Sequence, residues 1–373
     1  MLEEDLKIFR QEIAAFCAAK IKPHVLEMDE KEEMRPEIIK GLFEMGLMGI
    51  EVPEIYGGAG GSFTMACLAI EEVSKVDPSV GVFIDVQNTL VNNIFGKWAS
   101  DAQKKKYFPQ LVQDKVGCFC LSEADSGSDA FALRTRAQPE KGGYLLTGKK
   151  MFITNAKEAS ILIVFANVNP EEGYKGITAF ILEKGMPGLS LGKKEKKLGI
   201  RASSTCEVVM EQVFVPKENI LGELGKGYKV AIETLNEGRI GIAAQMLGLA
   251  QGAFNGALSY ARERKQFGKT IDQFQGVQFE LARLACQIEY SKHLVFQAAL
   301  LKDQKKPFAK EAAIAKYQVS QVAEEVASKA LEIYGGYGFI KEFPAEKFYR
   351  DAKIGKIYEG TSNLQLQTIF KLL

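Results

Sequence analysis

The spacing of apolar residues divides the chain into three regions. In the first, residues 1–116, apolar positions recur at helical spacing, as at Leu6, Phe9, Ile13 and Phe16. Proline residues and a glycine-rich stretch separate the candidate helices along this region. We therefore expect an N-terminal helical domain over residues 1–116.

The pattern changes in residues 117–222, where short apolar runs are separated by Gly, Pro and Asn. Residues 160–168 form a continuous apolar run, which is typical of a buried strand, and residues 176–182 and 206–215 are further strand candidates. Residues 144–154 predict two strands around a glycine turn. We expect a small all-β domain here, a barrel or a sandwich.

Helical spacing returns in residues 223–373. The long interval without proline between Pro216 and Pro307 allows very long helices. Long helices with short connections favour a four-helix bundle. The expected helices cover residues 228–265, residues 275–305, a segment from Pro307 to Gly335-Gly336, and a segment capped by Thr361, Ser362 or Asn363.

Composition excludes several classes of protein. The chain has 48 Lys and Arg against 47 Asp and Glu, so its near-neutral charge gives no reason to expect a nucleic-acid partner. The six cysteines include no Cys-x-x-Cys pair and there are only two histidines, so we expect no metal site. No apolar run reaches the length of about 20 residues that a transmembrane helix needs. The acidic start, Met1-Leu-Glu-Glu-Asp5, is unlike a leader peptide, so either none exists or the leader has been removed.

Two motifs in the β region could hold a ligand. Phe119-Cys-Leu-Ser-Glu-Ala-Asp-Ser-Gly-Ser-Asp129 is a strand that runs into a turn, and the N–H groups and hydroxyls of such a turn can bind an anion or a heteroaromatic edge. An ordinary capped turn is the alternative. Lys150-Met-Phe-Ile-Thr-Asn155 is a second candidate, or simply a half-buried strand in which Phe152 belongs to the core.

Two further motifs lie near the ends of the long helices. Tyr260-Ala-Arg-Glu-Arg-Lys-Gln-Phe-Gly268 precedes Gln275, and Arg264 suits a pyrophosphate because a guanidinium can pair with two oxygens at once. A charged helix end is the alternative reading. Glu332-Ile-Tyr-Gly-Gly336 ends a helix with two glycines, which let the backbone approach a ligand closely.

The last motif, Ile357-Tyr-Glu-Gly-Thr-Ser-Asn363, presents a carboxylate just before a capped helix. Enclosure by apolar groups would raise the pKa of Glu359 toward the range of a general base, whereas the helix N-terminus would lower it. The sequence leaves the balance open. The alternative is that Glu359 is only a capping carboxylate.

Taken together and in this order, the motifs resemble the acyl-CoA dehydrogenase family over the whole chain. The likeness is strongest to members that act on short and 2-methyl-branched chains, through stretches such as residues 236–251. The resemblance implies FAD-dependent α,β-dehydrogenation of a short or short branched-chain acyl-CoA to a trans-2-enoyl-CoA, with electrons passed to an electron-transfer flavoprotein. It also implies a homotetramer in the mitochondrial matrix, or in the cytoplasm of a prokaryote, with a place in fatty acid metabolism or branched-chain amino acid degradation.

The resemblance also assigns roles to residues. Glu359 would be the base that removes the α-proton, and Gly238 matches the position on the long helix where some members carry theirs. The implied FAD contacts are Phe119, Cys120, Leu121, Ser122, Gly127, Ser128, Phe152, Ile153, Thr154, Arg264, Gln275, Glu332, Ile333, Tyr334, Gly335, Gly336, Thr361, Ser362 and Asn363. The implied substrate contacts are Ser128, Tyr174, Tyr228, Asn236, Glu237, Gly238 and Arg239.

Three rival functions remain at this point. The same site run in reverse would be an enoyl-CoA reductase. An acyl-CoA oxidase is disfavoured because such chains usually carry an additional C-terminal domain. A catalytically silent relative that binds CoA esters is disfavoured by the joint presence of Glu359, Thr154 and Arg264.

Overall fold

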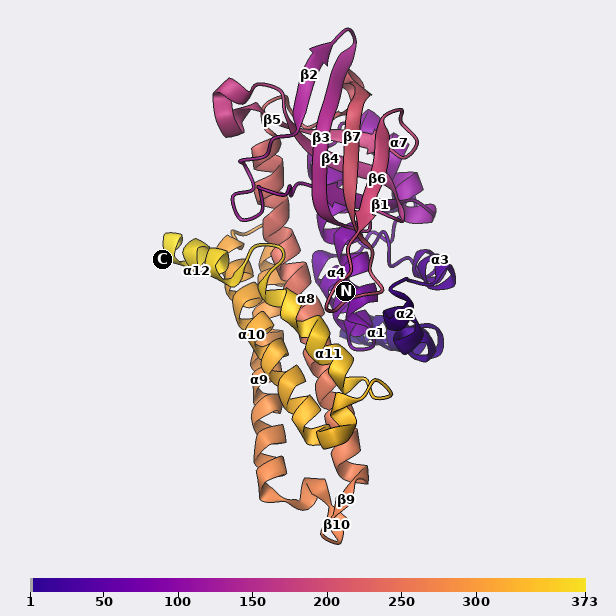
Figure 1. Ribbon diagram of the computed structural model, residues 1–373, viewed down its shortest axis with the longest axis vertical. Helices are drawn as coiled ribbons and strands as arrows, with labels where there is room; N and C mark the ends of the chain where they lie inside the picture. Colours follow the sequence, from indigo (N-terminus) through magenta and orange to yellow (C-terminus); the bar gives the residue numbers. More distant parts are fainter. Residues whose placement is uncertain (1–2) are drawn as a thin grey trace.

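The chain folds as a helical region, a β region and a second helical region, in the order that the sequence predicts (Figure 1). The computed structural model describes residues 3–373, so Met1 and Leu2 of the acidic start lie outside the described residues. The β region forms one end of an elongated molecule, and the long C-terminal helices extend from it toward the other end. Among residues 3–373, no helix has both the length and the apolar character needed to cross a membrane.

The N-terminal helices have clear local start signals. Asp77 accepts a hydrogen bond from Ser79 N at 2.9 Å and precedes Pro78, so it caps α5. Ser100 and Gln103 form a reciprocal capping box at the start of α7. The helices are α1 (Glu3–Phe16), α2 (Val25–Lys31), α3 (Pro36–Glu44), α4 (Phe63–Ser74), α5 (Pro78–Asp85), α6 (Asn93–Trp98) and α7 (Asp101–Gln113), with the π-helical segment η4 (Val86–Asn92) between α5 and α6.

The β region is one mixed sheet of eight strands in the order β6-β7-β3-β2-β4-β5-β8, with β1 paired to β4. The two halves of the sheet meet where β2 pairs with β4 at Arg136 and Asn167. Side chains from both halves enclose a separate hydrophobic core. The strands are β1 (Val116–Cys120), β2 (Arg136–Glu140), β3 (Gly143–Thr154), β4 (Ala159–Asn167), β5 (Ile177–Glu183), β6 (Leu189–Lys194), β7 (Thr205–Pro216) and β8 (Ile220–Leu221).

The prediction of two strands around a glycine turn in residues 144–154 is wrong. The segment is the single strand β3, and its register against β7 shifts between Leu146 and Gly148. A Cβ atom at Gly148 would lie 2.5 Å from Thr135 Oγ1 and 2.8 Å from Thr135 Cα. Gly148 therefore marks a β-bulge with a close backbone approach, which is the other common reason for a glycine in a strand.

The C-terminal region is organised around the 37-residue helix α8 (Gly227–Glu263). It packs against α4, α5 and α10, and its small residues let the backbones come close. A Cβ added at Gly248 or Gly252 would lie 2.2 Å from the carbonyl oxygen of Glu71 or Lys75, respectively, on the N-terminal side. The other elements are α9 (Gln275–Asp303), α10 (Ala309–Tyr334), α11 (Ala345–Ala352), α12 (Ser362–Lys371) and the hairpin of β9 (Lys265–Gln266) and β10 (Lys269–Thr270); α11 was not expected from the sequence.

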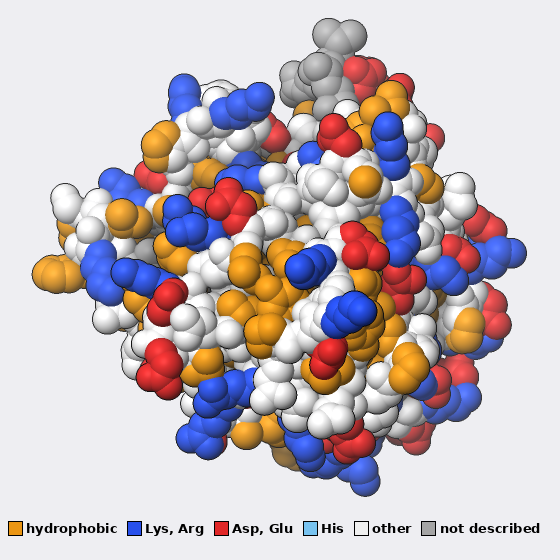
Figure 2. Space-filling view, turned by 90° about the horizontal axis from the view of Figure 1, so that it is seen from above, with side chains coloured by type: hydrophobic (Ala, Val, Ile, Leu, Met, Phe, Trp, Pro, Cys, Tyr) orange, Lys and Arg blue, Asp and Glu red, His pale blue; other side chains and the backbone are white. Residues whose placement is uncertain are grey.

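The surface carries charges of both signs. Figure 2 shows the end of the molecule that holds the β region, where basic and acidic side chains alternate around apolar ones. Many charges of the described residues are paired, such as Lys106 with Glu183 at 2.7 Å.

A buried charge cluster joins all three regions. Lys347 Nζ on α11 lies 2.8 Å from Asp77 Oδ1 and 2.6 Å from Asp351 Oδ2, and the three side chains are at most 2% exposed. The other oxygen of Asp351 accepts a hydrogen bond from the backbone N–H of Ile200, which belongs to the β region. Each charge of the cluster has a partner, which is the condition under which buried charges are tolerated.

We predict that Lys347→Met lowers the free energy of unfolding by about 3–5 kcal/mol, because two buried carboxylates lose their cation. Chemical denaturation of the purified variant measures this. Lys40→Met is the matched control, since the Lys40–Glu44 pair is exposed and should contribute nothing measurable. Equal stability of the two variants would contradict the role of the cluster.

Candidate active site

Glu359 lies in a strained turn immediately before α12. Its φ is 49° and that of Gly360 is 88°, so two consecutive residues adopt the left-handed conformation. For a residue other than glycine this costs about 1 kcal/mol, and such strain clusters at functional sites. Thr361 accepts a hydrogen bond from Leu364 N and is the capping residue of α12. Thr361 therefore caps α12, and the Glu359 side chain is not needed as the cap.

The Glu359 carboxylate occupies space that α8 leaves open at Gly238. A Cβ atom at Gly238 would lie 2.9 Å from Glu359 Oε2 and 2.8 Å from Leu90 Cδ2. Oε2 is buried and has no hydrogen-bond partner among the described residues, although the residue as a whole is partly exposed. An unpartnered buried carboxylate oxygen is unusual in a folded protein and is available for a ligand.

Burial decides the proton affinity of this carboxylate. Desolvation raises the pKa of Glu359 to about 7, and the positive charges of Lys316 and Arg239 only partly oppose the rise. Burial is thus the largest influence on the proton affinity of Glu359, as enclosure by apolar groups would require. A carboxylate with this pKa is suited to take a proton near neutral pH.

The turn is held by two side chains that the sequence analysis missed. Lys316 on α10 donates to Gly360 O at 2.6 Å, and Gln365 on α12 donates to Gly360 O at 2.9 Å and to Glu359 O at 3.2 Å. Both side chains are fully buried. The sequence does contain a signal for Lys316, because this lysine lies on the face of α10 that otherwise carries small and apolar residues such as Ala312 and Val319.

Glu237, the neighbour of Gly238, forms an ion pair away from Glu359. Its Oε2 lies 3.3 Å from Lys302 Nζ, which also contacts Glu51 at 3.1 Å. These three residues line a separate cavity of about 520 Å³ between the N-terminal helices and the end of α9. Because Glu237 already has an ion-pair partner, Glu359 is the better candidate for a general base.

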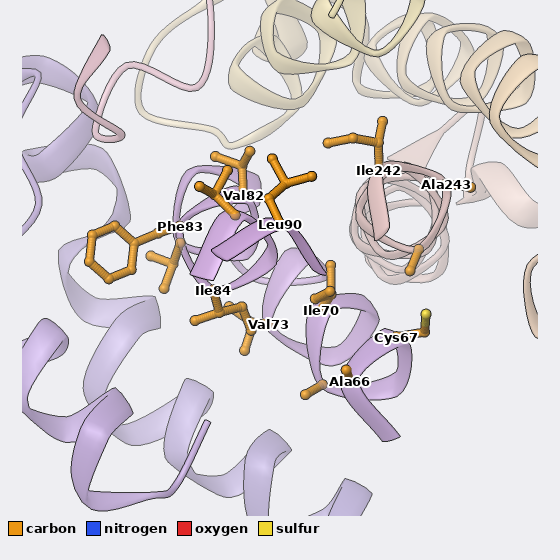
Figure 3. Packing of buried hydrophobic residues seen from close by; sticks show 14 of the residues in the cluster. Ala66, Cys67, Ile70, Val73, Val82, Phe83, Ile84, Leu90, Ile242 and Ala243 are labelled. Atoms are coloured by element: carbon orange, nitrogen blue, oxygen red, sulfur yellow. The ribbon is translucent and has the colours of Figure 1, made fainter. Parts of the chain in front are cut away.

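The surroundings of Glu359 on the N-terminal side are apolar. Leu90 lies against the Gly238 position, and Val82, Leu90 and Ile242 point into the same space between the N-terminal helices and α8 (Figure 3). All three are at most 2% exposed. These side chains belong to the hydrophobic core that the N-terminal helices share with α8.

The two candidate motifs of the β region are brought together. Met151 N donates to Ser122 O at 2.9 Å, which joins β3 to the turn after β1. The buried Lys150, also missed, contacts Glu123 Oε1 at 2.7 Å and Leu121 O at 3.1 Å, and so fixes this turn. This motif also contains a strained backbone position, since Phe152 has a φ of 60°. The Phe152 side chain is 60% exposed.

The residues of these motifs differ in what they can offer a ligand. Ile153 and Cys120 are buried in the β core and Phe119 packs on Phe165, so these side chains are already occupied. Gly127 and Ser128 are exposed at the turn. Phe152, partly exposed Ser122 and Thr154, and the backbone of the turn therefore form the accessible surface.

Four of the predicted substrate contacts form two pairs. The rings of Tyr174 and Tyr228 meet edge to face with centroids 5.0 Å apart, near the start of α8. Two to three turns further along α8, Arg239 donates to Asn236 Oδ1 at 2.8 Å. The Arg239 Nε atom is buried without a partner among the described residues and can still donate.

The remaining motif residues lie at the other end of the molecule. Arg264 directly follows α8, Glu332-Ile-Tyr334 ends α10 before Gly335 and Gly336, and Gln275 begins α9. Arg264, Ile333, Tyr334, Gly335 and Gly336 line a cavity of about 520 Å³, and Glu332 lines an adjoining one of about 380 Å³. At 1.5 Å per residue, Gly238 and Arg264 are about 40 Å apart along α8.

Three family models together cover nearly the whole chain. The N-terminal, middle and C-terminal domains of acyl-CoA dehydrogenase match residues 3–115, 118–213 and 225–373. The chain belongs to the acyl-CoA dehydrogenase family. FAD is the cofactor of this family, and the accessible Phe152–Thr154 surface and the Arg264 cavity are suited to its flavin and its phosphates.

Individual acyl-CoA dehydrogenases are similar over their full length. A probable short/branched chain specific acyl-CoA dehydrogenase of Dictyostelium discoideum is 56% identical, covering 99% of this chain and 90% of the relative. The mitochondrial short/branched chain specific enzyme of Rattus norvegicus is 51% identical over 99% of this chain and 85% of its own length. Butyryl-CoA dehydrogenase from Megasphaera elsdenii, and a chain in a structure of the electron transferring flavoprotein of Acidaminococcus fermentans, each superpose with a TM-score of 0.98, 42% identity and coverage of 100% of this chain and 98% of the other.

We predict that Gly238→Ala lowers kcat without loss of bound FAD. The new methyl group would contact Glu359 Oε2 and Leu90 within 3 Å, and would displace the carboxylate from its position. Steady-state kinetics and the flavin absorbance of the purified variant measure the two effects. Gly96→Ala in α6 is the control, because a Cβ there meets open space; equal kcat in both variants would contradict the prediction.

Proposed function

We propose that this acyl-CoA dehydrogenase converts short or short branched-chain acyl-CoA esters to trans-2-enoyl-CoA esters, with Glu359 as the base that removes the α-proton. The observation that carries the assignment is the unpartnered Oε2 of Glu359, buried beside Gly238 and Leu90 with a pKa raised to about 7. The reaction requires a base at the α-carbon and, at the β-carbon, a hydride acceptor, which FAD supplies when it is bound.

The protein contributes position, proton transfer and exclusion of water. In the proposed reaction the proton moves from the α-carbon to Glu359 Oε2, and the apolar side chains of Val82, Leu90 and Ile242 surround the hydrocarbon. Arg239, Tyr174 and Tyr228 would contact the CoA portion. Thr154 would donate a hydrogen bond near the flavin, where charge accumulates during hydride transfer.

The decisive experiment is Glu359→Gln. Glutamine has nearly the same volume but accepts no proton, so we predict that flavin bleaching by a short acyl-CoA slows by at least ~10²–10⁴-fold. Anaerobic mixing followed at the flavin absorbance measures the rate, and a spectral change without bleaching shows that the ligand still binds. Bleaching at the parent rate would refute the assignment and leave Glu237 as the next candidate.

The proposed substrate class rests on the relatives, whose names specify short and branched chains or butyryl-CoA. We predict that kcat/KM is highest for acyl groups of about four or five carbons, including 2-methyl-branched ones. A series of chain lengths measures this, with each additional methylene that can be buried worth ~0.8 kcal/mol. A maximum at twelve or more carbons would contradict the proposal.

We further propose that the protein is a homotetramer in which two subunits share each FAD. The flavin surface near Phe152 belongs to the end of β3, whereas the phosphate cavity at Arg264 lies at the far end of α8, so the two lie in different parts of one chain. Phe267, Phe279 and Phe339, which lie near the Arg264 cavity, are 93%, 68% and 82% exposed, as expected where another subunit packs. A neighbouring subunit would bring the two halves together.

Complementation between two inactive variants tests this sharing. We predict that Arg264→Ala weakens FAD binding roughly 10- to 100-fold, from the loss of a charge-assisted hydrogen bond. When Arg264→Ala and Glu359→Gln subunits are co-expressed, each mixed pair contains one site with both original residues, so activity should return. If mixing restores nothing while each variant alone still assembles, one chain holds the whole FAD site.

Two further aspects follow the family. We propose that electrons pass to an electron-transfer flavoprotein, in agreement with the similar chain in the structure of the Acidaminococcus fermentans flavoprotein. The compartment would be the mitochondrial matrix, as for the rat relative, or the cytoplasm in a prokaryote. Assaying the enzyme with and without the flavoprotein, in both the oxidative and the reductive direction, distinguishes the dehydrogenase from an enoyl-CoA reductase.

A further inference from the structure

We infer that Lys316 on α10 is a positioning residue for Glu359. Lys316 fixes the strained turn and supplies the counter-charge of the Glu359 carboxylate. This inference rests on the proposed role of Glu359 as the base. Lys316 itself touches neither the substrate nor the flavin in this proposal. It acts through one backbone hydrogen bond and through its charge.

The environment of Lys316 differs from that of two other lysines buried in the described part of the chain. Lys150 has Glu123 at 2.7 Å, and Lys347 has carboxylates at 2.8 and 2.6 Å. Lys316 is 0% exposed and no carboxylate within residues 3–373 is recorded at ion-pair distance from it. A buried ammonium without a direct counter-ion is strongly disfavoured, so its presence in an otherwise apolar helix face needs an explanation.

The hydrogen bond of Lys316 has a structural role at the turn. Its Nζ donates to Gly360 O at 2.6 Å, next to the residue whose φ is 49°. One helical turn further along α10, Ser320 donates to Gly355 O at 2.8 Å. The same face of α10 thus holds the connection from α11 to α12 at two carbonyls, and the bond from Lys316 is the one beside the base.

The charge of Lys316 is linked to that of Glu359. Among the groups that act on the Glu359 carboxylate, Lys316 is the strongest opponent of the burial that raises its pKa, followed by Arg239 on α8. Burial lowers the pKa of Lys316 to about 8, and the negative charge of Glu359 opposes that fall. Asp85 on α5 and Tyr358 also lie within electrostatic range, and burial raises the pKa of both well above the usual range, which favours their neutral forms. Between pH 7 and 8, Lys316 and Glu359 are therefore each other's counter-charge.

The sign of the effect follows from this arrangement. Without the ammonium, the carboxylate form of Glu359 loses stabilisation, so its pKa rises further. From a pKa of about 7, the fraction of Glu359 able to accept a proton at pH 7 then falls about fivefold for the first unit of that rise and about tenfold for each further unit. Raising the pH restores the carboxylate. A lysine that serves only packing would lower stability but leave the midpoint of the pH profile unchanged.

Three substitutions separate the charge from the hydrogen bond. Lys316→Met removes both, Lys316→Gln keeps a donor for Gly360 O without the charge, and Lys316→Arg keeps both. Ser320→Ala is the matched control, because it removes the neighbouring hydrogen bond to Gly355 O without any change of charge. FAD content and thermal unfolding of each purified holoenzyme establish that the variants fold.

Two readouts test the inference on the holoenzyme. The first is the pH dependence of kcat/KM with a short acyl-CoA, and the second is the infrared band of the protonated Glu359 carboxyl, assigned by its loss in Glu359→Gln. We expect Lys316→Gln and Lys316→Met to move both midpoints to higher pH, with about a fivefold or greater loss of rate at pH 7. Lys316→Arg and Ser320→Ala should keep the parent midpoints.

The outcomes distinguish an error in the role of Lys316 from an error in the role of Glu359. Parent midpoints in Lys316→Gln would overturn the inference, and this variant decides alone if Lys316→Met does not fold. If Glu359→Gln still bleaches the flavin at the parent rate, the proposed base is wrong. The infrared midpoint still reports whether Lys316 controls the protonation of Glu359, because that measurement does not depend on turnover.

Discussion

The structure depends on the close approach of the N-terminal helices to α8. Glycines at 248 and 252 bring the backbone of α8 against carbonyl groups at the end of α4, and Gly241 leaves room for the carboxyl of Asp85. Larger residues at these positions would push the N-terminal region away from the C-terminal helices. The space beside Gly238 that holds Glu359 exists only because this distance is short. A packing constraint spread along one helix therefore fixes the geometry of a site formed by three separate parts of the chain.

Buried charge is handled in two different ways in the same fold. At Lys347 and Lys150, direct ion pairs neutralise the ammonium and join distant segments. At Glu359 and Lys316 the charges are kept apart, so neither is fully satisfied by the other. Complete pairing favours stability, whereas incomplete pairing leaves a carboxylate reactive. The difference agrees with the general observation that perturbed pKa values gather at functional sites.

Local signals were sufficient to predict the long helices of the C-terminal region, although not α11. The interval without proline predicted a helix over residues 228–265, and α8 covers Gly227–Glu263. The motif around Glu359 was also visible, because a carboxylate before a capped helix is a local pattern. The glycine at 148 was misread because a bulge and a turn use the same residue, and only the register against β7 distinguishes them. The supporting lysines could not be predicted, since their partners are remote; Lys347 and Asp77 are 270 positions apart.

The length of α8 has a consequence for how the protein acquires its cofactor. Arg264 lies about 40 Å from Gly238 along α8, and the proposed flavin surface belongs to the β region, so a newly made subunit would present only half of each FAD site. Cofactor binding and subunit association would then be thermodynamically linked, and each would strengthen the other by mass action. Scarcity of flavin would shift the population toward separated subunits, whose exposed phenylalanines are prone to aggregation. The supply of the vitamin would in this way govern the lifetime of the protein as well as its activity.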